Sequence, residues 1–274
     1  MEKIAMWYLF ITLASYAITP HLITLTGRAI APLPMPPAAL PATPVAATSP
    51  APTLHVTVKT SVTYADNVRG VIEHRYRYGR DSLGREGFLD AQGQLYGGPD
   101  TFVARVTAAL HDIEQGGPTG RSLIDYLEEA PDSTDIAYSM TDEADMQNGA
   151  YVFWNAGGGG MPRPAFIGLA HELAHISDIW HKTVNRELWR QIQNDQGQWV
   201  QVPYAELYAT HIENKIRSEN GLPLRVSYAM PGMEDGGEIS SMILKPGTRE
   251  SLYFDREEHT AYRRLKKSQP PMVY

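Results

Sequence analysis

The sequence contains no cysteine. Disulfide frameworks, thiolate metal sites, iron–sulfur clusters and cysteine nucleophiles are therefore excluded, and any metal ion has to be held by His, Asp or Glu. Basic residues are also fewer than acidic ones. The chain has 24 Lys and Arg against 31 Asp and Glu, which gives a formal net charge of -7. A chain with this balance has no global positive field that would attract nucleic acid. We therefore expect no nucleic-acid partner.

Charged residues are also missing from most of the N-terminal region. Residues 4–25 contain no Asp, Glu, Lys or Arg, and residues 29–53 contain eight prolines, eight alanines and no charge. The first run has the apolar core of a signal peptide and is close to the ~20 residues of a membrane-spanning helix. The second has the composition of an extended linker. We predict a signal peptide or a membrane anchor at 1–28, which as an anchor would tether the protein through residues 4–25, and a Pro/Ala-rich linker at 29–53.

Strand and helix patterns alternate in residues 54–274, which we predict to form one α+β domain. Leu54–Tyr64 places β-branched and aromatic side chains at period two, which is typical of a half-buried strand. Further elements are predicted as follows: a strand at 75–78, helices over 102–113 and from 123, and strands at 136–139 and 151–155. Residues 259–274 are basic and end in a proline-containing stretch, which predicts a surface helix followed by a frayed terminus.

The segment Ala165–Ile179 is apolar over most of its helical circumference and is predicted to form a buried central helix. It contains the residues HELAH at 171–175. Four helical residues turn the chain by about 400°, so His171 and His175 lie on one face and both imidazoles can reach one ion. Glu172 lies about 100° from His171 and can sit beside a water molecule on that ion. With no thiolate present, two imidazoles and a carboxylate indicate a catalytic zinc ion.

The third ligand has to come from a downstream segment, and Glu206 is the prediction. It lies in a helix that Pro203 can start, and the small Ala209 would allow close approach to the metal helix. Glu213, seven residues further on, shares roughly the same helical face and is a competing candidate. Arg217, four residues beyond Glu213, offers that side chain an ion pair instead.

His181 gives a different third ligand. The HELAH histidines and His181 have the spacing of the metzincin motif, with Asp178 in place of its usual glycine, and Ser227–Pro231 is similar to a Met-turn. In this interpretation His181 binds the metal. If Glu206 binds it instead, Asp178 is expected to hydrogen-bond the free nitrogen of a metal-binding histidine.

The segment ELYATHIENKIRSENGLPLRVSY at 206–228 carries a more specific resemblance. Together with HELAH it resembles the NleD-like zinc metallopeptidase family, the type III effector-like HExxH proteases. Members of this family pair an HELxH helix with a downstream E-x-x-A-x-x-x-x-N-x-I-R segment and a G-L-P-L-R-x-x-Y element. The resemblance covers about residues 150–230.

This resemblance implies roles for particular residues. Arg225 and Tyr228 also resemble the R-x-x-Y pair of clostridial neurotoxin light chains, in which both side chains face the substrate carbonyl. A structural ion pair for Arg225 and a core position for Tyr228 are the alternatives that the residues themselves leave open. The general base implied by the family is Glu172, and the Zn2+ ligands implied are His171, His175 and Glu206.

We therefore predict a zincin-like metalloprotease domain with a small sheet and a central HExxH helix. Its expected activity is zinc-dependent hydrolysis of peptide bonds in a protein or peptide substrate, which would pair as an added strand with residues 151–155. A non-enzymatic, zinc-stabilised binding module is the alternative function. The hydrophobic N-terminus predicts a protein that is secreted or membrane-anchored outside the cytoplasm, and the family resemblance implies an effector delivered to a host cell.

Overall fold

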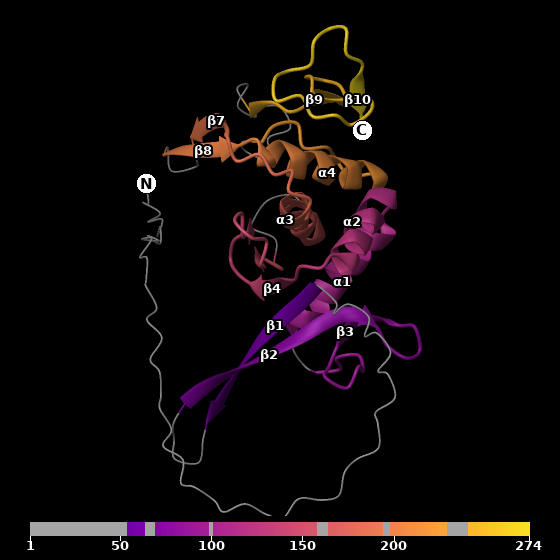
Figure 1. Ribbon diagram of the computed structural model, residues 1–274, viewed down its shortest axis with the longest axis vertical. Helices are drawn as coiled ribbons and strands as arrows, with labels where there is room; N and C mark the ends of the chain where they lie inside the picture. The colour runs from indigo at the N-terminus through magenta and orange to yellow at the C-terminus, as the bar shows by residue number, and fades with distance from the viewer. Residues whose placement is uncertain (1–53, 64–68, 99–100, 158–163, 194–197, 229–240) are drawn as a thin grey trace, which may run out of the picture. The chain divides into compact units, whose positions relative to one another are not determined.

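The computed structural model describes a mixed α+β fold over residues 54–63, 69–98, 101–157, 164–193, 198–228 and 241–274 (Figure 1). The predictions for the N-terminal segment at 1–28, for the linker at 29–53 and for a Met-turn beyond Tyr228 fall outside these residues. Within the described ranges, no helix is both long and apolar enough to span a membrane.

The fold is built on a six-stranded mixed sheet with the strand order β3-β2-β1-β4-β6-β5. Its strands are β1 (Leu54–Thr63), β2 (Arg69–Arg80), β3 (Glu86–Leu89), β4 (Thr134–Tyr138), β5 (Glu143–Ala144) and β6 (Tyr151–Trp154). The first three strands form an antiparallel meander, β1, β4 and β6 run parallel, and β5 is antiparallel to β6. All the strands predicted from the sequence are present, and β3 and β5 are short strands of this sheet for which no strand was predicted.

The position of β6 corrects one prediction. On one side β6 pairs with β4, where Val152 lies opposite Ile136, and on the other it pairs with β5, where Val152 lies opposite Ala144. On the β5 side, the backbone N–H of Asp145 also donates to the Tyr151 carbonyl at 2.9 Å. The pairing of β6 with a substrate, expected from the sequence, is therefore wrong, because both of its edges are occupied. At this end of the sheet the outer strand is β5.

In the described residues the helices are α1 (Thr101–Gln115), α2 (Pro118–Glu129), α3 (Ala165–Trp180) and α4 (Ala205–Glu219). Helix α3 is central, since every residue from Ile167 to Trp180 is buried. It contacts α4 on one side and the β5–β6 end of the sheet on the other, with α1 and α2 beside it (Figure 1). The helix predicted at Ala165–Ile179 is thus present and lies at the core of the fold.

A carboxylate joins the ends of α2 and α4. Thr119, the second residue of α2, donates its backbone N–H to the Glu219 carboxylate at 3.1 Å and its hydroxyl at 2.5 Å. The first N–H groups of a helix have no partner inside the helix, and a negative charge there interacts favourably with the helix dipole. Glu219, the last residue of α4, therefore caps α2 and holds the end of α4 against it.

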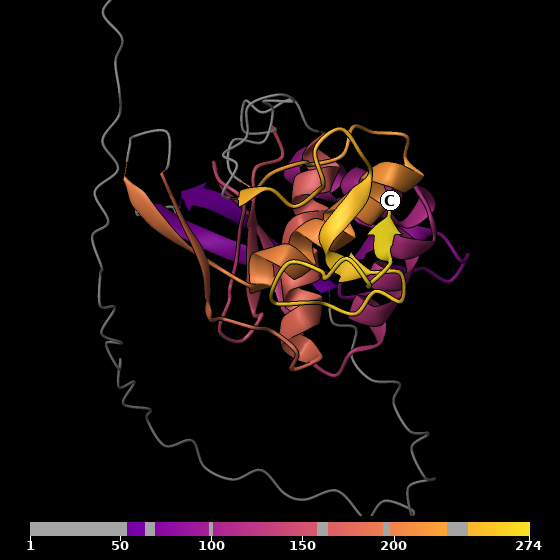
Figure 2. The ribbon, with the colours of Figure 1, turned by 90° about the horizontal axis from the view of Figure 1, so that it is seen from above.

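A second hydrophobic cluster packs against Leu207 of α4, on the side of α4 away from α3 (Figures 1 and 2). In this cluster the indole N–H of Trp189 donates to the Tyr253 hydroxyl at 3.3 Å. The strands that supply its side chains are β7 (Leu188–Gln193), β8 (Trp199–Pro203), β9 (Glu250–Asp255) and β10 (Pro271–Val273). Helix α4 is thus buried between two clusters, which fixes its position beside α3.

The C-terminus corrects a second prediction. Residues 259–274 form no helix, and the chain does not end in a frayed tail. Strand β10 pairs antiparallel with β9, and the buried Tyr274 places its hydroxyl 2.7 Å from His211 Nδ1. The Tyr274 carbonyl also accepts from Arg249 Nε at 2.6 Å. The last residue is therefore anchored to α4.

Candidate metal centre and active site

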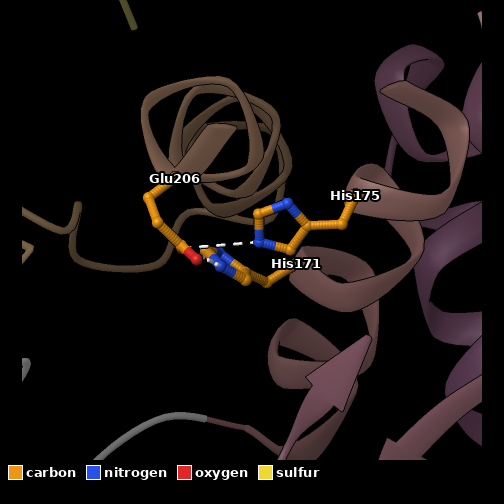
Figure 3. A group of neighbouring side chains, drawn as sticks. All are labelled: His171, His175 and Glu206. Atoms are coloured by element: carbon orange, nitrogen blue, oxygen red, sulfur yellow. Dashed lines mark hydrogen bonds and ion pairs between the residues drawn. The ribbon is translucent and has the colours of Figure 1, made fainter. Parts of the chain in front are cut away.

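Two histidines of α3 and a glutamate of α4 point toward one another (Figure 3). His171 Nε2 lies 3.1 Å from Glu206 Oε2, and His175 Nε2 lies 3.4 Å from the same oxygen. The two imidazole rings stand almost at right angles, with an interplanar angle of 82°. Two ring nitrogens and one carboxylate oxygen therefore converge on one point from two helices.

Helix packing explains why Glu206 reaches the histidines. Glu206 lies in the first turn of α4, where a negative charge interacts favourably with the helix dipole. Ala205 and Ala209 of α4 and Ala174 of α3 are all buried. Small residues at a helix contact allow a short distance between the helix axes. The carboxylate of Glu206 can therefore span the gap to α3.

The donor set fits a zinc ion. The ligand atoms of His171, His175 and Glu206 all lie within 4.8 Å of one another. Ligands bound at ~2.1 Å in a tetrahedral zinc site are about 3.4 Å apart. The separations of 3.1 and 3.4 Å are close to that value. Two imidazoles and one carboxylate also leave a fourth position for water or substrate, as in catalytic zinc sites.

The same contacts set the protonation states of the metal-free cluster. Burial alone would lower the pKa of His171, but hydrogen bonds to Glu206 and Glu213 outweigh burial and raise the pKa to about 9. Burial would raise the pKa of Glu206, yet His175 and His171 hold that pKa well below its usual range. In the absence of a metal, His171 is therefore protonated at neutral pH beside an ionised carboxylate.

Glu213 holds His171 from the side opposite Glu206. Its Oε2 lies 3.0 Å from His171 Nδ1 and 3.0 Å from Arg225 Nη1, and its Oε1 accepts from Arg217 Nε at 2.7 Å. Burial would raise the pKa of Glu213, but the charge of Arg225 and the hydrogen bond with His171 hold it well below its usual range. An ionised Glu213 orients the Nδ1–H of His171, so that Nε2 faces the cluster.

Asp178 was predicted from the sequence to orient a metal-binding histidine in this way, and that prediction is wrong. Asp178 Oδ1 accepts a hydrogen bond from Thr183 Oγ1 at 2.6 Å. Within the part of the chain that the structure describes, His175 Nδ1 has no hydrogen-bond partner. The free nitrogen of a cluster histidine is held by Glu213, which the sequence had suggested as a competing ligand and as a partner of Arg217.

Arg225 and Tyr228 lie beside the cluster and contact each other. The Arg225 guanidinium carbon is 4.7 Å from the centre of the Tyr228 ring, and Nη2 donates to the Tyr228 carbonyl at 2.8 Å. Burial raises the pKa of Tyr228, and the charge of Glu206 raises it further; the Tyr228 hydroxyl also hydrogen-bonds Glu206. The structure therefore brings the Tyr228 hydroxyl to the cluster and places Arg225 against Glu213.

The segment that leads to Tyr228 is held by side chains of α4. Asn214 binds the backbone of Arg225 in both directions, because the Arg225 N–H donates to Asn214 Oδ1 at 2.7 Å and Asn214 Nδ2 donates to the Arg225 carbonyl at 2.9 Å. Arg217 Nη1 donates to the Pro223 carbonyl at 3.0 Å. Three side-chain to backbone hydrogen bonds therefore hold this segment against α4 at Pro223 and Arg225.

Glu172 lies next to the cluster and is buried. Burial raises its pKa, the charges of His171 and His175 oppose this shift, and the charges of Glu206 and Asp142 add to it. Asp142 belongs to the β4–β5 loop, where its Oδ1 accepts the backbone N–H of Asn155 at 2.8 Å. A buried carboxyl with a raised pKa beside a candidate metal-binding cluster is suited to proton exchange.

His181 does not join the cluster. Its ring stacks on Tyr126 at 3.9 Å, and Nδ1–H donates to the Ser177 carbonyl at 2.8 Å. Glu206 completes the group that contains the two HELAH histidines. The metzincin interpretation, which requires His181 as a ligand, is therefore not supported.

An α+β fold with a buried His-His-Glu cluster and an adjacent glutamate defines a candidate metal-dependent hydrolase. The chain belongs to the Peptidase_M91 family, whose model is described as effector protein and matches residues 90–228. This match agrees with the resemblance to NleD-like effector peptidases, and it includes α1 to α4 and the segment up to Tyr228. It supports a peptidase with a protein substrate. No curated protein and no solved structure matches the chain.

Glu213→Gln is expected to destabilise the protein by ~3–5 kcal/mol, because it leaves two guanidinium groups buried without their anion. These groups, on Arg217 and Arg225, are each only 8% exposed. Urea unfolding of the metal-free protein measures the change. Glu250→Gln, which removes an exposed ion pair with Lys245, is the control and should cost about 1 kcal/mol or less. Equal stability of the two variants would contradict the network.

Proposed function

We propose that the chain is a zinc-dependent endopeptidase that hydrolyses peptide bonds in a protein substrate. The observation that carries this proposal is the convergence of His171, His175 and Glu206 on one point, with the Glu172 carboxyl beside them. Membership of a peptidase family of effector proteins supports it independently. We infer that residues 54–274 form a zincin-like catalytic domain.

Glu172 is the proposed general base. A zinc ion held by the cluster would lower the pKa of a water molecule and polarise the substrate carbonyl. Glu172 takes a proton from the attacking water and passes a proton to the leaving amine. Its raised pKa suits both steps, because a carboxyl whose pKa lies nearer the working pH accepts and releases a proton more readily.

Tyr228 is the proposed oxyanion donor. Its raised pKa keeps the phenol protonated at neutral pH, so that the hydroxyl can donate to the oxygen that becomes negative during attack. Each nitrogen of the Arg225 guanidinium already contacts a protein oxygen, in Ser227, Glu213 or Tyr228. We therefore assign Arg225 to positioning Tyr228, which differs from the sequence-based expectation that both side chains face the substrate.

The N-terminal region is proposed to serve export. Residues 1–28 would act as a signal peptide or membrane anchor, and residues 29–53 would link this segment to the catalytic domain. The family description as an effector supports delivery to a host cell, where the substrate protein would be found.

Glu172→Gln is expected to keep the metal and lose hydrolysis. The substitution preserves side-chain volume and leaves the three ligands untouched but removes the proton acceptor, so kcat should fall ~10²–10⁴-fold. Peptide-library cleavage together with metal analysis of the same sample tests this. Glu187→Gln changes an exposed carboxyl and is the matched control. Unimpaired cleavage by a zinc-loaded Glu172→Gln protein would refute the assigned base, and a wild-type protein that binds zinc without any cleavage would favour the binding module.

Tyr228→Phe is expected to lower kcat by roughly 10²-fold with little change in KM, because it removes one donor to the oxyanion. The ring that packs against Arg225 and Trp189 is retained, so the fold should be unaffected. Tyr262→Phe removes the hydroxyl of an exposed tyrosine and is the control. A higher KM at constant kcat would show that Tyr228 only binds substrate.

Zinc affinity is expected to rise with pH up to about 9. Zinc requires the His171 Nε2 without its proton, and the pKa of His171 in the metal-free protein is about 9. Below this value, each fall of one pH unit weakens the apparent zinc affinity about tenfold for each proton displaced. Competition with a zinc-binding dye at several pH values, corrected for protonation of the dye, measures the slope. A flat profile would show that His171 carries no proton to displace.

A further inference from the structure

A second group of side chains of the kinds that bind metals lies at the other end of the sheet. In the β2–β3 ladder Arg80 is opposite Glu86, and Tyr78 is opposite Phe88, so the four side chains share one face. Helix α1 packs against β3 and presents His111 and Glu114, which are three residues apart and so lie on one side of the helix. Side chains from two strands and a helix therefore meet at this face.

The donor atoms of this group are close together. One ligand atom from each of Glu86, His111 and Glu114 lies within 4.8 Å of the other two. His111 Nε2 is 3.9 Å from Glu86 Oε2, whereas Arg80 pairs with the other oxygen, Oε1. The Arg80 side chain is 64% exposed and leaves Oε2 available to a further cation. Small rotations would bring the three donors to the roughly 3.4 Å separation of a zinc site.

Two polar atoms at this face lack partners in the described residues. Glu114 Oε2 is buried and accepts no hydrogen bond, and the hydroxyl of Tyr78, a side chain that is 1% exposed, has none either. Burial raises the pKa of Tyr78 most. Glu86 and Glu114 lie close enough for their charges to raise this pKa further. Buried polar groups in native proteins are nearly always satisfied, so these two atoms point to a missing ligand.

The group also carries an excess of negative charge. Glu128 of α2 adds a third carboxyl, and burial together with the charges of Glu86 and Glu114 raises its pKa to about 7. Among the residues that the structure describes, Arg80 is the permanent cation that acts against these three carboxyl groups. A divalent ion would balance the remaining charge.

We propose that Glu86, His111 and Glu114 bind a divalent transition-metal ion that is separate from the HELAH centre. The imidazole selects zinc and neighbouring transition metals over calcium and magnesium, which prefer oxygen ligands. The ion joins β3 to α1 and thereby stabilises the base of the sheet. Because it binds the folded chain and has no preformed site in the unfolded one, it raises the stability of the fold without touching the catalytic residues.

The test counts zinc ions in the full chain after loading and removal of weakly bound metal. The wild type should hold about two ions per chain, and His111→Ala and Glu114→Gln should each hold about one. His111 is 45% exposed, so its removal should leave the fold intact, as circular dichroism would check. Asp112→Asn alters an exposed carboxyl next to His111 in α1 and is the matched control, which should retain both ions.

The His175→Ala variant distinguishes the proposed second site from the HELAH centre, because it removes a ligand of the HELAH centre alone. In this background the remaining ion should still raise the melting temperature, and a further His111→Ala change should abolish the increase. A wild type with one ion that His175→Ala removes would overturn the second site, as would a zinc-dependent increase that survives in the double variant. An ion retained by His175→Ala and lost in the double variant would support it even if the HELAH centre proved not to bind zinc.

Discussion

The buried carboxylate of Glu213 is the contact on which the rest of the candidate active site depends. It binds a histidine of α3, the last turn of its own helix through Arg217, and the following segment through Arg225. Burial costs several kcal/mol for each ion, so these charges are stable only while all the partners keep their positions. The alignment of α3 with α4 and the path of the chain to Tyr228 are therefore coupled through one side chain.

The position of His171 between two carboxylates would let a proton on Nε2 take the place of a metal ion. His171 directs Nδ1 to Glu213 and Nε2 to Glu206, so in the metal-free protein it carries a positive charge between two carboxylates. A metal at Nε2 would displace one of the two ring protons, and the proton on Nδ1 would continue to bind Glu213. In both states a cation faces the Glu206 carboxylate. In the part of the chain that the structure describes, the permanent cation that pairs with Glu86 is the largely exposed Arg80.

Sequence patterns predicted the parts of the structure that depend on local periodicity. The helix Ala165–Ile179 and the approach of Glu206 followed from helical spacing and small residues, and both are present. The role of Glu213 depends on how α3 crosses α4, which a single helix does not encode. The occupied edge of β6 and the burial of Tyr274 depend on the short strands β5 and β10. Two or three residues carry no periodicity that a sequence could reveal.

The motif that carried the family resemblance has a structural explanation in these contacts. Glu206 faces the histidines, while Asn214 and Arg217 hold the backbone at Arg225 and Pro223. Each of these side chains projects from α4, so one helix both supplies a candidate metal ligand and guides the segment that ends at Tyr228. Side-chain to backbone hydrogen bonds hold this segment at Pro223 and Arg225, and backbone hydrogen bonds join Val226 and Tyr228 to residues 241–244. The spacing of the motif residues is therefore explained by the way in which α4 positions the segment that ends at Tyr228.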